Sequence, residues 1–186
     1  MKKTVPGADT PVFFDIEASG FDGVPIEIGW AYADLETGVI HVESHLINPP
    51  REWTINQVWD KRAAKLHGIS RQDLQTQGLP PQKIAERMNS ILADCMLYAD
   101  DPVWDEDWLD ALYYSTTLSP SFTVHPLPAS GMIDNRAREN GWEGGRFSVL
   151  LKSIGEEYRT VHRAGEDARQ LASLWLAASR KSPNAS

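Results

Sequence analysis

The sequence is poor in cysteine and basic residues and contains no long apolar run. Its 186 residues include a single cysteine, Cys95, which excludes an internal disulfide and a cysteine-rich zinc site and is typical of a reducing compartment. No stretch approaches the ~18 consecutive apolar residues of a membrane span. The basic N-terminus is interrupted by Pro6, Gly7 and Asp9 before an apolar signal segment forms. We therefore expect a cytoplasmic protein with no membrane partner.

Acidic residues outnumber basic ones, 26 to 18, which gives a net charge of −8. This balance argues against binding nucleic acid through a broad basic surface. It is compatible with carboxylates gathered to hold divalent cations, because the ions reverse the charge locally. The length and an apolar content of 41% predict a single domain over residues 1–186, with a core from about 11 to 180 and flexible termini.

The hydrophobic patterns predict an α/β fold in which helices pack on a mixed sheet. An antiparallel meander of three strands comes first, and shorter strands then alternate with helices. We expect strands over 11–20, 26–38, 39–48, 96–99 and 121–127. We expect helices over 56–66, 81–93, 133–140, 147–154 and 164–179, and a further helix that starts at 101.

The first strand carries two acids, Asp15 and Glu17, on one face. Residues two apart in a strand point the same way, so both carboxylates lie on the side opposite Phe14 and Ile16. Neighbouring carboxylates repel unless a cation lies between them, and oxygen ligands on a rigid strand suit Mg²⁺ or Mn²⁺. The same short pattern is also typical of an acidic strand surface that faces solvent.

The segment 100–110 surrounds two tryptophans with six acids. Asp101-Pro102 predicts a helix start, because Asp is a favoured N-cap and Pro suits the first helical position. A helix wound from there forms an apolar stripe made of Trp104, Trp108, Ala111 and Leu112. Most of the acids then face solvent, as on an ordinary amphipathic helix.

Asp105 differs from the other acids of this segment. At about 100° per residue, it falls inside the sector bounded by Trp104, Leu109 and Leu112, so it faces the core. A buried carboxylate without a partner is costly. Its partner is either a metal ion or a structural hydrogen-bond donor such as an arginine, and the segment alone favours neither.

The segment VHRAGEDARQLASLW brings a histidine close to another acid. His162 and Asp167 lie about 140° apart if both are helical, but they converge if His162 precedes a helix that begins near Ala164. A neutral histidine is the usual proton acceptor for activating water, and Asp167 would add an oxygen ligand. The alternatives are a surface histidine and an acid that interacts with the positive end of a helix.

Taken in order, FFDIEASGF, VWDEDWL and HRAGEDA resemble the motifs of the DEDD superfamily of 3′-to-5′ exonucleases. KLHGIS also resembles a stretch of that superfamily, and the likeness runs from about Val12 to Trp175. The sister branch carries Tyr where Arg163 stands here, so the chain is more similar to the histidine branch. The second motif departs from the family, because Asp100-Asp101-Pro102 replaces a His-Asn-Ala lead-in. Asp101 is therefore a rival to Asp105, although the Trp-Asp-x-x-Trp-Leu frame favours Asp105.

The resemblance implies an RNase H-like fold and two divalent cations, Mg²⁺ or Mn²⁺. Carried over by position, Asp15, Glu17, Asp105 and Asp167 would hold the metals, and His162 would take the proton of the attacking water. Ser19, Gly20 and Phe21 would contact the terminal nucleotide of the substrate.

The implied activity is hydrolysis from the 3′ end of single-stranded nucleic acid with release of nucleoside 5′-monophosphates. Two alternatives stay open: an exoribonuclease for short oligomers or tRNA ends, and a catalytically silent nucleic-acid-binding domain of the same fold. The sequence distinguishes neither DNA from RNA nor a monomer from a homodimer.

Overall fold

The computed structural model describes residues 5–7, 9–53, 58–142, 148, 150–152, 154 and 161–182. Its strands are β1 (Val12–Ala18), β2 (Pro25–Ala33), β3 (Ile40–Leu46), β4 (Met96–Tyr98) and β5 (Thr123–Val124). A short 3-10 helix, η1, covers Arg51–Trp53. The α-helices are α1 (Lys61–His67), α2 (Arg71–Gln77), α3 (Pro81–Leu92), α4 (Pro102–Tyr114), α5 (Ala129–Glu139) and α7 (Ala164–Ala178).

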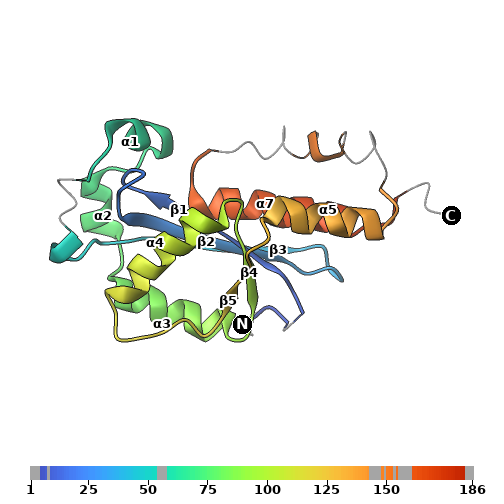
Figure 1. Cartoon of the computed structure of the whole chain (residues 1–186), viewed down its shortest axis with the longest axis horizontal. Helices are drawn as coiled ribbons and strands as arrows, with labels where there is room; N and C mark the ends of the chain where they lie inside the picture. The colour runs from blue at the N-terminus through green and yellow to red at the C-terminus, as the bar shows by residue number, and fades with distance from the viewer. Residues whose placement is uncertain are drawn as a thin grey trace.

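The five strands form one mixed sheet in the order β3-β2-β1-β4-β5. β2 pairs antiparallel with β1 and β3, while β4 pairs parallel with β1 and β5. Helices α5 and α7 cover one face of the sheet, and α3 and α4 cover the other (Figure 1). The predicted fold class, an RNase H-like α/β fold with an antiparallel meander and parallel strands, is confirmed.

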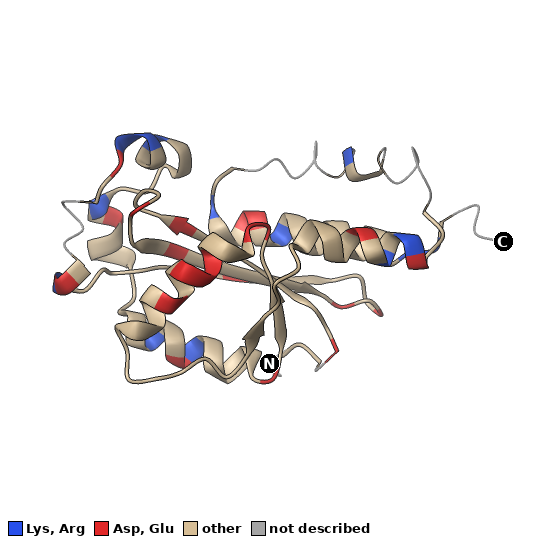
Figure 2. Ribbon diagram, viewed as in Figure 1, with Lys and Arg blue, Asp and Glu red and all other residues tan. Residues whose placement is uncertain are grey.

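Acidic residues are concentrated along α4, on the neighbouring strands and at the start of α7 (Figure 2). Among the described residues, no helix has both the length and the apolar character that crossing a membrane requires.

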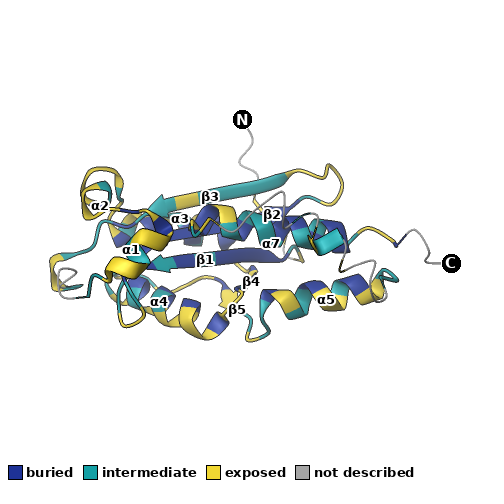
Figure 3. Cartoon of the chain, turned by 90° about the horizontal axis from the view of Figure 1, so that it is seen from above, coloured by how far each residue is buried: buried dark blue, intermediate teal, exposed yellow. Residues whose placement is uncertain are grey.

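The alternation of β1 divides the core into two parts. Phe14 and Ile16 pack with α3 and α4, whereas Phe13 packs with α5 and α7. All nine residues of β2 are buried, as expected for a central strand covered on both faces (Figure 3). Asp15 and Glu17 therefore lie on the α7 side of the sheet, on the face that the alternation of the sequence predicts.

Close packing between backbones holds α7 on β2. A methyl group on Gly29 would collide with the backbone of Ala164 and Gly165, and one on Gly165 would press on Ser44 of β3. Glycine at these two positions thus lets the first turn of α7 approach the sheet directly. The residues just before and within that turn are placed over the C-terminal half of β1.

Several predicted elements differ from the structure at their ends. α1 starts at Lys61 rather than 56, and residues 54–57 lie outside the described ranges. α5 begins at Ala129, four residues before the predicted 133, because the chain turns into the helix directly after Pro128. β5 spans two residues instead of seven. The helix predicted over 147–154 falls partly on residues outside the described ranges.

Helix α2 was not predicted from the sequence. This helix has seven residues, too few for a clear apolar period, and it begins with a capping box. The side chain of Ser70 accepts from the backbone of Asp73, and the Asp73 carboxylate accepts from the backbone of Ser70. The Ser-x-x-Asp pattern was the available sequence signal.

Candidate metal and catalytic site

Three of the predicted site residues converge at the C-terminal half of β1. Ligand atoms of Glu17, His162 and Asp167 all lie within 4.8 Å of one another. Asp167 belongs to the first turn of α7, and His162 precedes that helix. His162 adopts a left-handed backbone conformation, with φ of 52°, which residues other than glycine adopt rarely. The arrangement agrees with the predicted position of His162 before the helix.

Asp105 reaches the same region from the other face of the sheet. It is 4% exposed, and its Oδ1 accepts a hydrogen bond of 3.1 Å from the backbone N–H of Ile16. β4 pairs with β1 only at Val12 and Phe13, so the Asp105 carboxylate occupies the edge of β1 beyond the end of β4. The rival, Asp101, is exposed at the start of α4.

The pKa values of all four carboxylates are raised, and burial is the largest cause for each. Burial raises the pKa of Asp15 well above its usual range, and the charges of Asp105, Glu17 and Asp167 raise it further. Burial, together with Asp167, raises the pKa of Glu17 to about 7. Burial raises the pKa of Asp105 to about 7 and also raises that of Asp167. The chain thus holds four acids where their negative charges are costly.

Divalent cations fit this donor set. The Oδ1 atom of Asp167 is buried and has no hydrogen-bond partner among the described residues. A buried carboxylate oxygen without a partner, beside the carboxylate of Glu17, is what a cation would complete. Oxygen ligands with one neighbouring imidazole suit Mg²⁺ or Mn²⁺.

An ion pair that the sequence analysis missed anchors the start of α7. The carboxylate of Glu27, 2% exposed on β2, accepts from Arg163 Nε at 2.9 Å and from Arg163 Nη2 at 2.7 Å. It also accepts from the backbone N–H of Ala164 at 3.1 Å. Because Glu27 pairs across the strands with Glu17, these bonds hold the His162 segment over β1. A lone acid within an apolar strand was the available sequence signal.

A cavity of about 430 Å³ opens beside these residues. Asp15, Glu17, His162 and Asp167 line it on the side of the sheet. The other lining residues are Ile16 of β1, Ser130, Ile133 and Asp134 of α5, Gln170, Leu171 and Leu174 of α7, and Asp100 and Leu151. Asp100 was treated in the sequence only as a variant lead-in to the second motif, yet it borders the cavity.

Phe21 stands beside this region as an exposed aromatic side chain. It is 73% exposed, and its ring lies edge-on to that of Trp104 with centroids 5.2 Å apart. Trp104 was predicted on the apolar stripe of its helix, but it is 38% exposed. The centroid of its ring also lies 6.1 Å from that of Trp108, so the two tryptophans share the predicted stripe, and the exposed Trp104 lies at its N-terminal end.

Ser19 and Gly20 shape the turn that carries Phe21. Ser19 is buried, and its hydroxyl accepts from the backbone N–H of Val24 at 3.0 Å. A Cβ at Gly20 would lie 3.0 Å from the Cβ of Asp60. Both residues thereby fix the direction in which the aromatic ring leaves β1.

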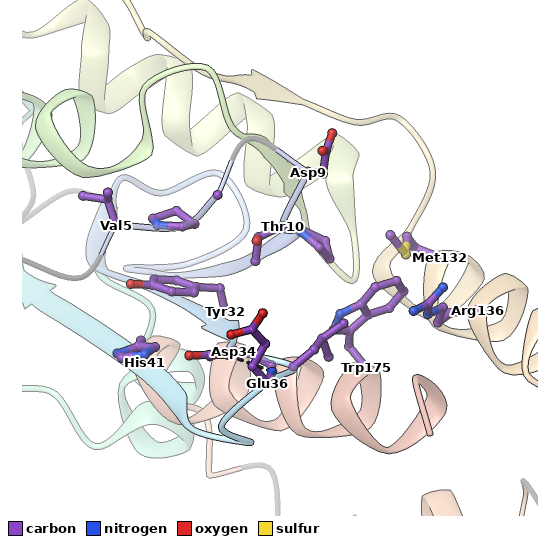
Figure 4. Close-up of a pocket in the computed structure, with 15 residues that line it drawn as sticks. Val5, Asp9, Thr10, Tyr32, Asp34, Glu36, His41, Met132, Arg136 and Trp175 are labelled. Atoms are coloured by element: carbon purple, nitrogen blue, oxygen red, sulfur yellow. Dashed lines mark hydrogen bonds between the residues drawn. The ribbon is translucent and has the colours of Figure 1, made fainter. Parts of the chain in front are cut away.

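A second cavity, of about 520 Å³, lies at the other end of the sheet (Figure 4). It is bordered by Tyr32, Asp34 and His41 from β2, β3 and their connection, and by Trp175 from α7. The ring of His41 stacks on that of Tyr32 with centroids 4.8 Å apart. None of the predicted site residues lines this cavity.

The sequence matches no protein-family model and no curated protein. Solved structures are similar in fold. Exonuclease I of E. coli in complex with a dA16 oligonucleotide aligns with a TM-score of 0.66 at 19% identity, over 92% of this chain and 41% of that one. A full-length 3′-exonuclease gives 0.55 at 13% identity, over 95% and 62%. The RNase domain of yeast Pop2 gives 0.58 at 12% identity, over 90% and 76%. The chain thus has the fold of these nucleases and spans about two fifths of exonuclease I.

Proposed function

We propose that this chain is a divalent-metal-dependent 3′-to-5′ exonuclease of the histidine branch of the DEDD superfamily. The observation that carries the proposal is the gathering of Asp15, Glu17, Asp105 and Asp167, whose pKa values are all raised by burial. Buried acids that repel one another destabilise a fold, so their presence in one place calls for a compensating cation.

These four carboxylates would hold two divalent cations, Mg²⁺ or Mn²⁺. When bound, the cations would neutralise the carboxylates and stabilise the charge that develops on the scissile phosphate. The strand and helix positions of Asp15, Asp105 and Asp167 provide rigid supports for the ligand oxygens.

His162 would act as the general base. An imidazole nitrogen accepts a proton from the attacking water as its oxygen bonds to phosphorus. The bond from phosphorus to the O3′ atom of the preceding nucleotide breaks, and O3′ takes up a proton. The product is a nucleoside 5′-monophosphate. The ion pair of Arg163 with Glu27 positions the histidine for this task.

The terminal nucleotide would lie against the turn after β1. Phe21 and Trp104 form an exposed aromatic pair there, and stacking on such rings tolerates any base. Ser19 and Gly20 contribute by holding the turn in shape. The folds of exonuclease I and of the Pop2 RNase domain support a nuclease, and they favour neither DNA nor RNA as the substrate.

The decisive experiment follows products from single strands labelled at the 5′ or the 3′ end. With Mn²⁺ present, we expect mononucleotides to appear at once from the 3′-labelled strand and a descending ladder from the 5′-labelled strand. Chelation should stop both. If neither DNA nor RNA released mononucleotides in a metal-dependent way, a catalytically silent nucleic-acid-binding domain would be the better interpretation.

The same assay separates a general nuclease from a specialist. Two-residue RNA, a tRNA 3′ end and a long DNA strand are compared at equal concentrations of 3′ ends. We expect release from all of them, because the exposed aromatic pair offers no base-specific contact. Activity confined to the short RNA would assign the exoribonuclease alternative.

A further inference from the structure

Helix α1 begins directly behind the turn that carries Phe21. Its N-cap residue, Asp60, donates its backbone N–H to the carbonyl of Ser19 at 2.7 Å. The Cα of Gly20 faces the side chain of the same aspartate. Both Figure 1 and Figure 3 show α1 beside the C-terminal end of β1. A nucleic-acid strand that leaves the candidate site past Phe21 on this side would therefore meet α1.

The exposed side of α1 is basic. Lys61, Arg62 and Lys65 are all exposed and none forms an ion pair within the described part of the chain. Lys61 and Lys65 are four residues apart and so share a helix face. Figure 2 shows blue segments on this short helix.

Most other basic side chains in the described ranges are neutralised. Acidic partners within 4.0 Å occur for Lys83, Arg87, Arg136, Arg138, Arg163 and Arg169. In a chain with a net charge of −8, three neighbouring cations without acidic partners stand out. They repel one another, and an anionic ligand would relieve that repulsion.

We propose that α1 binds the phosphate backbone of the substrate strand just upstream of the terminal nucleotide. This inference rests on the proposed function. The charge of the helix is complementary to phosphate, and the helix is continuous with the turn that would hold the terminal base. The seven residues of α1 make a helix only about 10 Å long. It would therefore contact the nucleotides next to the terminal one, whereas the scissile bond would lie at the acidic site.

A charge-reversed pair tests the proposal. The variant Lys61→Glu/Lys65→Glu is compared with Arg180→Glu/Lys181→Glu, which changes the net charge equally at two exposed positions after α7. Both variants keep the fold, because the side chains lie in solvent, and circular dichroism checks this. An acid at the first position of α1 also suits the helix dipole.

Kinetics on strands of increasing length give the first readout. For a long single strand we expect the α1 variant to raise KM about tenfold while kcat stays unchanged. Loss of two phosphate contacts should also reduce the slope of log(kcat/KM) against log salt by about 1.4. A dinucleotide, which does not reach α1, should be hydrolysed equally by the wild type and both variants.

Binding of a labelled strand, followed by fluorescence anisotropy, gives a second readout that needs no turnover. The wild type and the Arg180/Lys181 variant should bind with equal affinity. The α1 variant should bind about tenfold more weakly, in line with the expected rise in KM. If the α1 variant behaves like its control at every length and in binding, the proposal is overturned. If binding depends on α1 but no protein releases nucleotides, the proposed exonuclease function fails while the phosphate surface stands.

Discussion

The two ends of the sheet both carry acids beside a cavity, but the pKa values of their carboxylates are shifted in opposite directions. At the C-terminal half of β1, burial raises the pKa values of Asp15, Glu17 and Asp105. At the other end, Asp34 is half-buried, and its Oδ1 accepts from the backbone of Glu36 at 2.9 Å (Figure 4) and from that of Thr37 at 3.1 Å. A hydrogen bond with the side chain of Thr37, together with these two backbone bonds, lowers the pKa of Asp34.

The difference shows that neither the number of acids nor the size of a cavity identifies a site. The cavity beside Asp34 is the larger, about 520 Å³ against 430 Å³, yet the carboxylate of Asp34 is already satisfied by its turn. Beside Glu17, a buried oxygen of Asp167 has no partner. The burial of ionisable carboxylates, with the repulsion between them, marks the end that would bind cations, and the size of the cavity does not.

The largest difference between the two ends should appear when one acid is neutralised at each. Asp15→Asn removes a proposed metal ligand, so we expect nucleotide release to fall about 10⁴-fold, or ~5 kcal/mol in the barrier. Asp34→Asn should leave the rate within about twofold, because its side chain only orders a turn. Steady-state rates with Mn²⁺ measure both. Equal losses in the two variants would show that the effect is structural.

A histidine at each end gives the next comparison. His162→Gln should lower kcat about 10³-fold with little change in KM, since it removes the proton acceptor. His41→Gln, which replaces a ring stacked on Tyr32, should leave kcat unchanged. A calorimetric titration with Mn²⁺ checks that the His162 variant still binds metal. Full activity of that variant would require another base.

The stability of the metal-free protein should depend on pH in the direction set by the buried acids. A carboxyl whose pKa is higher in the folded than in the unfolded state stabilises the fold below the unfolded pKa, and this stability is lost as pH rises through the folded pKa. The folded pKa values of Glu17 and Asp105 are about 7. With chelator present, the melting temperature should therefore decrease as the pH rises from about 4.5 to about 8.

Two variants sharpen this test. Asp105→Asn keeps an acceptor for the N–H of Ile16 but carries no charge. At pH 8 its free energy of unfolding should therefore exceed that of the wild type by about 2–3 kcal/mol, and it should unfold at a higher temperature. Asp34→Asn should act in the opposite direction, because the lowered pKa of Asp34 belongs to a charge that favours the fold at neutral pH. If the wild type had equal melting temperatures at about pH 4.5 and about pH 8, the raised pKa values assigned to the buried acids would be contradicted.

The smallest effect concerns the exposed aromatic pair. Phe21→Ala should raise KM for a single strand by about tenfold, in line with ~1–3 kcal/mol for one stacked base. Tyr114→Ala, which removes a side chain 94% exposed at the end of α4, is the matched control. Unchanged KM in both variants would exclude Phe21 from substrate binding.

How much of the site could be predicted depended on how local each signal was. The face shared by Asp15 and Glu17 follows from strand alternation, and the inward direction of Asp105 follows from the helical period. Glu27, Asp100 and the exposure of Trp104 were missed, because each depends on which distant element packs beside it. The short α2 was missed because its capping box is its main signal.

By itself, the sequence determined the order of strands and helices, the fold class and the face on which most of the acids lie, because alternation and helical period act over a few residues. Only the tertiary structure decided that acids from β1, α4 and α7 meet. That meeting depends on the sheet order, on the end of β4 that exposes the edge of β1 to Asp105, and on the glycines that let α7 approach β2. These are contacts between residues far apart in the chain, and no local pattern encodes them.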